Sequence, residues 1–267
     1  MKRTLSLLLG LSLFAAASVV AQEAKKDAPK KDAPKKAAAP AVKLPAQPAD
    51  VAAPKLGPDG KPQANFLAAH ETYVAIAKKG KAQVVFLGDS ITSGWARNPD
   101  IFEKEFGQYN AANFGIGGDR VQHVLWRVEN GEFEGIKPKA VVLMIGTNNA
   151  GVAENSPEQI AAGIKNIIDA IHKRSPDTKV LLLAIFPRGE KEDPKTNPGR
   201  AKNQAVNAII AKLDDGKKVH FFDIGQKFLK PDGTLTVEIM KDRLHLTPLG
   251  YQIEADAIRE KLASLVK

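Results

Sequence analysis

Five short apolar runs constrain the fold of this chain more than any other feature. They lie at residues 84–87, 111–114, 141–145, 180–185 and 219–222. Several of them are apolar throughout instead of alternating, which is typical of strands that are buried on both faces of a parallel sheet. The runs therefore predict five buried strands, and a chain of 267 residues is long enough to cover such a sheet with helices.

Helical patterns lie before, between and after these runs. Residues 65–79 and 199–213 carry apolar side chains at helical spacing. Ser156 is followed by a proline and, three positions on, by Gln159, which is a typical helix start. Thr247, also followed by a proline, begins a last predicted helix. Alternation of strands and helices predicts a three-layer α/β/α sandwich with right-handed crossovers.

The first 21 residues have the pattern of a secretory signal peptide. Lys2 and Arg3 precede an apolar run at 5–20, and small residues at positions 19 and 21 suit a cleavage site. The alternative is a membrane anchor, but this run is shorter than the roughly 20 residues that span a bilayer. We therefore expect cleavage near Ala21 and a periplasmic or extracellular protein.

Residues 22–64 differ in composition from the rest of the chain. They contain no aromatic residue but 8 of the 17 prolines, and they begin with a repeated Lys-Lys-Asp-Ala-Pro sequence. This composition predicts a disordered, extended linker before a folded domain at 65–267. The linker and the signal peptide together hold 11 basic and 5 acidic residues, so they carry two thirds of the net charge of +9.

The basic linker has two interpretations. It is either a solvated spacer or a segment that contacts anionic polymers of the cell envelope. Export argues against a nucleic-acid partner, and so does the lack of aromatic side chains between the lysines, because single-stranded nucleic acid is bound by stacking its bases on aromatic rings.

Candidate functional residues follow three of the predicted strands, where parallel α/β sheets bind their ligands. Ser90 follows the first strand in a Gly-Asp-Ser sequence, and a glycine-rich segment at 115–118 follows the second. Glycines allow backbone N–H groups to approach a ligand closely, but this segment lacks the P-loop and dinucleotide-binding patterns. Asn148 and Asn149 follow the third strand, where an amide can orient a substrate or donate to an oxyanion.

Asp242 and His245 lie three residues apart, just before the helix predicted at Thr247. At this spacing a carboxylate can reach Nδ1 of the imidazole and leave Nε2 to accept a proton from a serine. Four further histidines lack such a setting and are predicted to be structural or surface residues: His70, His123, His172 and His220. The chain has no cysteine and no two histidines at ligand spacing, so we expect neither a disulfide nor a metal site.

Taken together, Ser90, Gly118, Asn148 and His245 resemble the four sequence blocks of the SGNH hydrolases, also called GDSL esterases. The leucine that follows the serine in that family is Ile91 here. Within the family, the chain is similar over roughly residues 70–265 to the catalytic subunits of intracellular platelet-activating factor acetylhydrolase. The segments that carry this similarity are 113–119, 123–127, 130–132, 136–139, 146–149, 187–191 and 244–247.

The resemblance implies a flavodoxin-like, five-stranded parallel sheet of order 2-1-3-4-5. It also implies that Ser90 is the nucleophile, His245 the general base and Asp242 the residue that orients His245. The oxyanion hole would comprise the backbone N–H groups of Ser90 and Gly118 and the side-chain amide of Asn148. No cofactor is implied, and the similar subunits suggest a homodimer.

These residues predict an exported serine esterase. We expect it to hydrolyse short acyl esters, acetyl esters above all, through an acyl-serine intermediate, with a small molecule or an acetylated carbohydrate as substrate. One alternative is a lipid hydrolase of the lysophospholipase or thioesterase type. Another is a non-catalytic module that binds the cell envelope through the same cleft.

Overall fold

The computed structural model describes residues 44–153, 155–193 and 195–267. The predicted signal peptide and the linker up to residue 43 lie outside the described residues. Five parallel strands form one sheet in the order β2-β1-β3-β4-β5. Their bounds are β1 Val84–Gly88, β2 Ala112–Gly115, β3 Ala140–Met144, β4 Lys179–Leu183 and β5 Val219–Phe222. The five predicted strands and the strand order are confirmed, with ends shifted by one or two residues.

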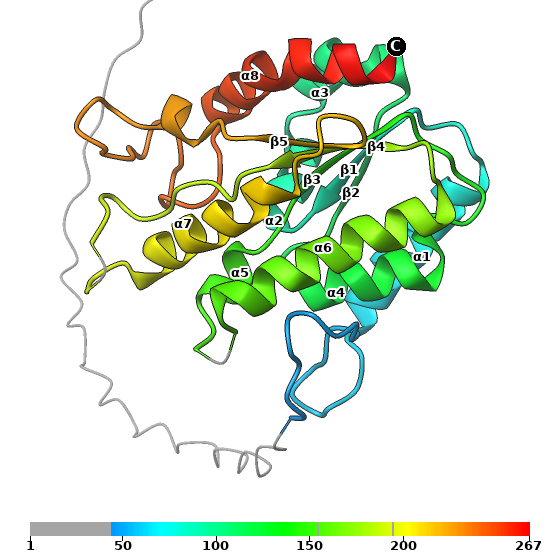
Figure 1. The fold of residues 1–267 in the computed structure, drawn as a ribbon, viewed down its shortest axis with the longest axis horizontal. Helices are drawn as coiled ribbons and strands as arrows, with labels where there is room; N and C mark the ends of the chain where they lie inside the picture. The colour runs from blue at the N-terminus through cyan, green and yellow to red at the C-terminus, as the bar shows by residue number, and fades with distance from the viewer. Residues whose placement is uncertain (1–43, 154, 194) are drawn as a thin grey trace, which may run out of the picture. The chain divides into compact units, whose positions relative to one another are not determined.

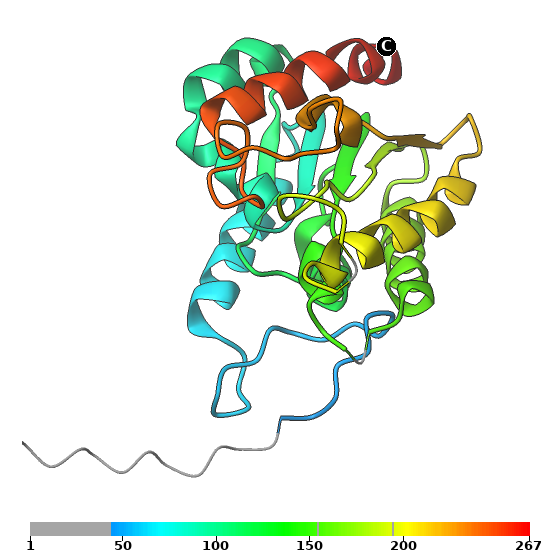
Figure 2. The same cartoon turned by 90° about the vertical axis from the view of Figure 1, so that its left-hand side faces the viewer.

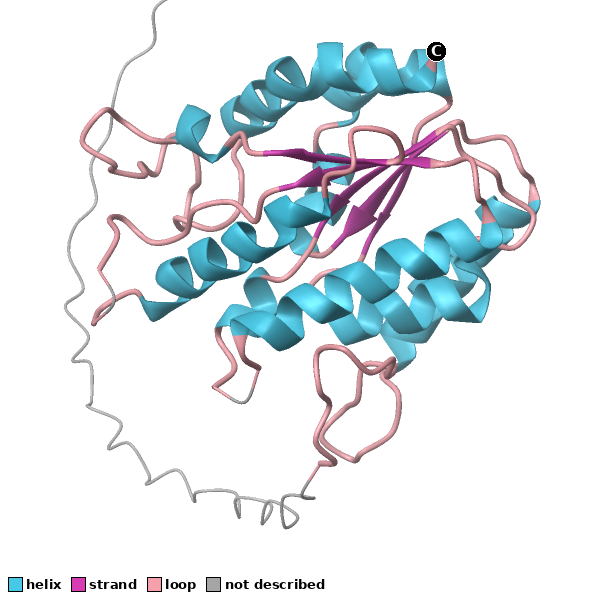
Figure 3. Ribbon diagram, in the orientation of Figure 1, coloured by secondary structure: helices cyan, strands magenta, loops and turns pink. Residues whose placement is uncertain are grey.

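Helices cover both faces of the sheet, as Figures 1 and 3 show. The helices on one face are α1 Ala64–Lys78, α4 Val121–Arg127, α6 Pro157–Arg174 and α7 Pro198–Ile210. The other face is covered by α3 Pro99–Phe106 and α8 Pro248–Val266. Side chains at alternate positions of each strand point into these two apolar layers, so Val85 and Leu87 pack in one layer and Val84 and Phe86 in the other. The predicted three-layer sandwich is confirmed.

Local sequence explains where the long helices begin. Ser156 Oγ accepts a hydrogen bond from the Gln159 N–H, and the Gln159 side chain accepts one from the Ser156 N–H, so the predicted capping box forms. Thr247 caps α8 in a similar way by accepting from the Gly250 N–H.

Four shorter helices were not predicted from the sequence. Two of them are α3 and α4. The other two are α2 Ser90–Ser93, which begins just after β1, and α5 Thr147–Ala150, which begins just after β3. A helix of one or two turns shows too little of the 3.6-residue period to be recognised from apolar spacing. Their positions matter because α2 and α5 carry Ser90 and Asn148.

Residues 44–63, which we call the strap, pack on the domain, so the prediction of a disordered linker through residue 64 is wrong for this part. Ala49 is fully buried in the apolar layer that holds α4 and α6. Gln122 of α4 donates to the Gln47 carbonyl at 3.0 Å, and Asn166 of α6 donates to the Asp50 carbonyl at 3.0 Å. Figure 2 shows the strap in blue beside these helices.

Glycine on α6 makes this contact possible. A Cβ at Gly163 would collide with the carbonyl oxygen of Ala49, so only a residue without a side chain lets the strap backbone approach. The strap is held by the side chains of two helices that lie far from it in the sequence. Its own composition could therefore not reveal that it is ordered.

Within the described residues, no helix is both long enough and apolar enough to cross a membrane.

Candidate active site

Ser90 lies at the first position of α2, immediately after β1. The preceding Asp89 caps this helix by accepting from the Ile91 N–H at 2.9 Å. Gly88 has room for no side chain, because a Cβ there would collide with Thr92 and with the Met144 carbonyl of the neighbouring strand. The tight strand-to-helix turn therefore presents Ser90 at the carboxyl edge of the sheet.

Ser90, His245 and Asp242 form a chain of hydrogen bonds. Ser90 Oγ lies 2.9 Å from His245 Nε2, and His245 Nδ1 lies 2.7 Å from Asp242 Oδ2. With the Nδ1–H donating to the carboxylate, Nε2 is left as the acceptor for the serine hydroxyl. The structure thus brings Ser90 into contact with His245, although the two residues are 155 positions apart in the sequence.

A short loop fixes the relative positions of Asp242 and His245. Asp242 Oδ1 accepts from the backbone N–H groups of Leu244 at 3.1 Å and His245 at 2.7 Å, and Arg243 between them has a φ of 56°. Burial would raise the pKa of Asp242, but the hydrogen bonds from His245 outweigh it and hold that pKa below its usual value. Asp242 is therefore ionised at neutral pH and can accept the hydrogen bond from His245 Nδ1–H.

The glycine-rich segment and Asn148 lie beside Ser90. A Cβ placed on Gly117 would be 3.9 Å from Ser90 Cβ, and Gly118 has a φ of 74°, which favours glycine. Asn148 Nδ2 donates to the Asp119 carbonyl at 2.8 Å and lies 3.4 Å from Asp89 Oδ2. The predicted donors Gly118 and Asn148 therefore flank the serine at the same sheet edge.

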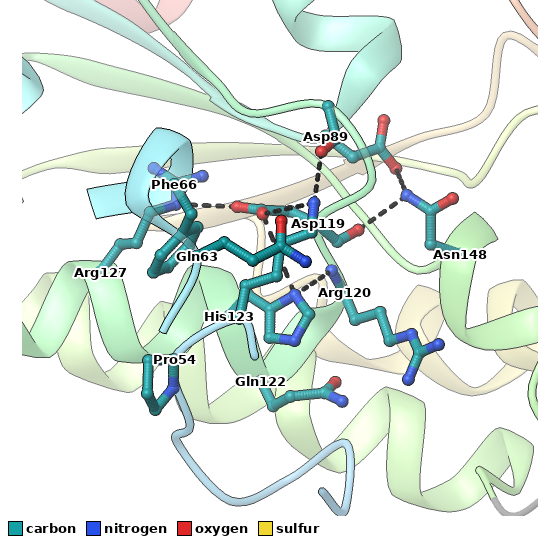
Figure 4. Close-up of polar contacts among 12 residues, drawn as sticks. Pro54, Gln63, Phe66, Asp89, Asp119, Arg120, Gln122, His123, Arg127 and Asn148 are labelled. Carbon is teal, nitrogen blue, oxygen red and sulfur yellow. Dashed lines mark hydrogen bonds and ion pairs between the residues drawn. The ribbon is translucent and has the colours of Figure 1, made fainter. Parts of the chain in front are cut away.

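A network of buried ion pairs supports the glycine-rich segment, and it was not predicted from the sequence. Arg127 of α4 pairs with Asp119 at 2.9 Å and with Glu132 at 2.5 Å, and it also donates to the Gly88 carbonyl at 3.2 Å. Glu132 in turn contacts His70 Nδ1 at 3.1 Å. Figure 4 shows Arg127, Asp119 and Asn148 in one line of contacts that ends at Asp89.

Burial shifts the titration of the carboxyls around the serine. It raises the pKa of Asp89 to about 7, against the opposing effect of the Ile91 hydrogen bond. It raises the pKa of Asp119 to about 6, with Arg127 acting in the opposite direction. Arg127 is the only Lys, Arg, Asp or Glu residue of α4, and this is the sequence signal that could have indicated a buried partner.

The remaining histidines have structural contacts, as predicted for them. His123 is buried, its Nδ1 accepts from the Arg120 N–H at 3.1 Å, and burial lowers its pKa to about 3, so it is neutral.

Arg188, which follows β4, donates to the Thr147 carbonyl at 2.9 Å and so holds the residue before Asn148 in place. In the described part of the chain, no group of three or more acidic or histidine side chains could hold a metal ion.

Comparisons with known proteins show which family this chain belongs to. The model of the GDSL-like lipase/acylhydrolase family matches residues 86–253. The chain is 41% identical over 202 residues to the platelet-activating factor acetylhydrolase IB subunit alpha1 of Pongo abelii, which covers 75% of this chain and 84% of the relative.

Two solved structures share the fold at lower identity. A GDSL-like lipase from Bacteroides thetaiotaomicron aligns with a TM-score of 0.60 and 23% identity, over 73% of this chain and 97% of its own. A carbohydrate acetylesterase from Sinorhizobium meliloti aligns with a TM-score of 0.54 and 20% identity, over 69% and 100%. The family match and the 41% identity lead to one conclusion: this chain belongs to the GDSL-like lipase/acylhydrolase family, whose chemistry is ester hydrolysis.

Proposed function

We propose that this protein is a serine esterase that removes short acyl groups, acetyl above all, from an alcohol. The observation that carries the proposal is the hydrogen-bonded chain from Ser90 Oγ through His245 to Asp242. In this reaction His245 takes the proton of Ser90 as the oxygen attacks the ester carbonyl. It then gives the proton to the leaving alcohol. Water hydrolyses the acyl-Ser90 intermediate with the same histidine as base.

The oxyanion of the tetrahedral intermediate would be bound by the N–H groups of Ser90 and Gly118 and by the amide of Asn148. The support for this assignment is the position of Asn148 Nδ2, which the Asp119 carbonyl holds at 2.8 Å beside the serine turn. A fixed donor stabilises developing charge without reorganising during the reaction.

Acetylated carbohydrate is the substrate that we favour. The structural relative from Sinorhizobium meliloti is a carbohydrate acetylesterase, and the 41% identical relative is an acetylhydrolase. Lysophospholipids and long acyl thioesters are the alternatives. A series of p-nitrophenyl esters from two to sixteen carbons separates these classes, and we expect the highest kcat/KM at two carbons.

Export is a further part of the proposal, and it rests on the basic, apolar and small-residue order of positions 1–21. Fractionation of cells that produce the full chain tests it, with the processed protein expected outside the cytoplasm. The basic residues of 22–43 would then space the enzyme from the envelope or hold it to anionic polymers there.

Ser90→Ala tests the reaction itself. We expect hydrolysis of p-nitrophenyl acetate to fall by at least ~10³-fold, because the nucleophile is lost. Ser264→Ala, on an exposed face of α8, is the matched control and should retain the wild-type rate. Equal rates for wild type and Ser90→Ala would refute the mechanism. Failure of a fluorophosphonate to label Ser90 would favour the non-catalytic binding module instead.

A further inference from the structure

A cavity of about 610 Å³ lies between the strap and the domain, next to the candidate oxyanion loop. Its walls come from the strap, from Gly118, from the start of α4 and from Val152, Asn155 and Gln159. Ser90, His245 and Asp242 do not line it. It is therefore a separate space that borders the reaction centre through Gly118.

Two cations face this cavity. Lys55 of the strap donates to the Gly117 carbonyl at 2.5 Å, with 18% of its side chain exposed. Its Nζ would lie 2.8 Å from a Cβ on Gly118, so the ammonium group lies directly against the loop. Arg120, at the start of α4, is the second cation. Figure 4 shows its guanidinium extending away from Asp119 and His123.

No described residue of the cavity lining balances the positive charge of Arg120. Among residues 44–153, 155–193 and 195–267, no carboxylate forms an ion pair with Arg120, and no acidic side chain lines the cavity. The adjacent residue Asp119 is buried and pairs with Arg127 at 2.9 Å, while its other oxygen is 3.9 Å from Lys55. His123, the remaining titratable group of the lining, is neutral.

The other polar groups of the lining are amides. Gln47 and Gln63 come from the strap, and Asn155 and Gln159 from the opposite wall. Amides donate and accept hydrogen bonds and suit hydroxyl groups, whereas guanidinium and ammonium groups suit carboxylate, sulfate or phosphate oxygens. A ligand that is both anionic and rich in hydroxyl groups matches this set.

We infer that the cavity under the strap is a subsite for an anionic group, such as a carboxylate, on the alcohol portion of the ester. The favoured substrate is an ester of an acidic sugar. This inference rests on the proposed esterase activity and narrows its substrate class. Arg120 binds the anion, and Lys55 adds to the positive field beside Gly118. Hydroxyl groups bind the amide atoms that the hydrogen bonds within the described residues do not use: Gln63 Oε1, Asn155 Nδ2 and Gln159 Nε2. The acyl group lies at Ser90, on the near side of the glycine loop.

Paired substrates test the subsite. The first pair is O-acetylated methyl glucuronide against O-acetylated methyl glucoside, which differ by one carboxylate. The second is acetylglycerol phosphate against monoacetylglycerol. The first member of this pair carries a phosphate like that of a lipid headgroup, and the second is neutral. We expect the wild type to prefer the acidic sugar over its neutral partner by about 10–100-fold in kcat/KM, the value of one charge-assisted contact.

Arg120→Gln should remove most of that preference and raise KM for the acidic sugar more than for the neutral one. Arg120→Lys should restore part of it, because a point charge remains without the bidentate geometry. The preference of the wild type should also weaken as salt is raised from about 0.02 to about 0.5 M, because the Debye length falls about fivefold over that range. Lys173→Gln, an exposed residue of α6, is the control for loss of one positive charge.

Binding provides a readout that does not need turnover. Titration of the full-chain Ser90→Ala protein with methyl glucuronide should show binding that Ser90→Ala/Arg120→Gln lacks. If no ester of any kind is hydrolysed, the proposed function fails while this titration still decides the subsite. Equal rates for acidic and neutral partners, or a preference that Arg120→Gln leaves intact, would overturn the inference. A preference confined to the phosphate pair would replace the sugar by a phosphate-bearing substrate.

Discussion

The two sides of the candidate active site differ sharply in their contact with solvent. On one side, the side chains of His245 and Asp242 are 32% and 47% exposed. On the other side, the side chains of Arg127, Asp119 and Glu132 beneath the glycine loop are fully buried. Both sides hold hydrogen-bonded carboxyl groups, yet only the first is exposed to water and substrate.

This difference follows from what each side must do. A general base has to exchange its proton with the substrate and with water, so His245 must stay accessible. Oxyanion donors have to stay in place while charge develops, and buried ion pairs with satisfied hydrogen bonds can fix a loop rigidly. The comparison predicts that changes on the buried side affect folding, whereas changes on the exposed side affect rate.

Arg127→Met gives the largest expected effect on stability. The substitution leaves Asp119 and Glu132 buried without their shared cation, which costs about 3–5 kcal/mol of unfolding free energy. Urea unfolding followed by circular dichroism measures this loss. Lys165→Met is the matched control, because the Lys165–Asp169 pair on α6 is 56% exposed on both side chains. That variant should lose less than about 0.5 kcal/mol. Similar losses for the two variants would show that the buried network contributes no more than a surface pair.

Asn148→Ala tests the boundary between the two sides. Its amide is part-buried, contacts the Asp119 carbonyl and lies beside the serine turn. Loss of one oxyanion donor should lower kcat for p-nitrophenyl acetate by about 10²–10³-fold, or roughly 3–4 kcal/mol, with little change in KM. Asn130→Ala, at an exposed position, should leave kcat unchanged. A large fall in stability with normal kcat would assign Asn148 to the buried scaffold instead.

Glu254 of α8 is a third case for this comparison. Its carboxyl group is buried like those of Asp119 and Glu132, but it forms no ion pair with an arginine among the described residues. It is 4% exposed, and its Oε2 has no hydrogen-bond partner among the described residues. Burial raises its pKa from 4.5 to about 8, against a hydrogen bond from Trp95. The folded state therefore holds the proton more tightly than the unfolded state. This stabilisation is complete below pH 4.5 and is lost as the pH rises through about 8.

Glu254→Gln removes this dependence. Between pH 5 and pH 8 the wild type should lose on the order of 3 kcal/mol more unfolding free energy than the variant. Other titrating groups contribute equally to both proteins and cancel in the difference. Parallel pH profiles for wild type and variant would mean that Glu254 is ionised in the folded state.

Much of the fold could be predicted because its causes are local. The five apolar runs, several of them apolar throughout, became β1 to β5, and the Ser156 capping box begins α6 as expected. The strand order was available only through family resemblance, since periodicity does not state which strands are neighbours. Ser90 and the Asp242–His245 pair were also predictable, because each lies at a strand end or helix start that the sequence marks.

The buried network was not predictable in the same way. Nothing in the spacing of Asp119, Arg127 and Glu132 distinguishes them from charges on a helix surface. Their pairing depends on α4 packing against the sheet with Arg127 turned inward, where it also reaches the Gly88 carbonyl. Burial is a property of the assembled layers, and it alone makes these charges structural.

Apolar patterning and capping act over a few residues, so they were sufficient to predict the class of fold and the strand positions. The residues proposed for ester hydrolysis were recognised from short motifs. The order of the strap and the cationic cavity beneath it depend on tertiary contacts. The strap has no apolar pattern of its own, and Ala49 is buried only because Gly163 and the neighbouring helices leave room for it. Contacts between segments more than 100 residues apart cannot be read from the composition of either one.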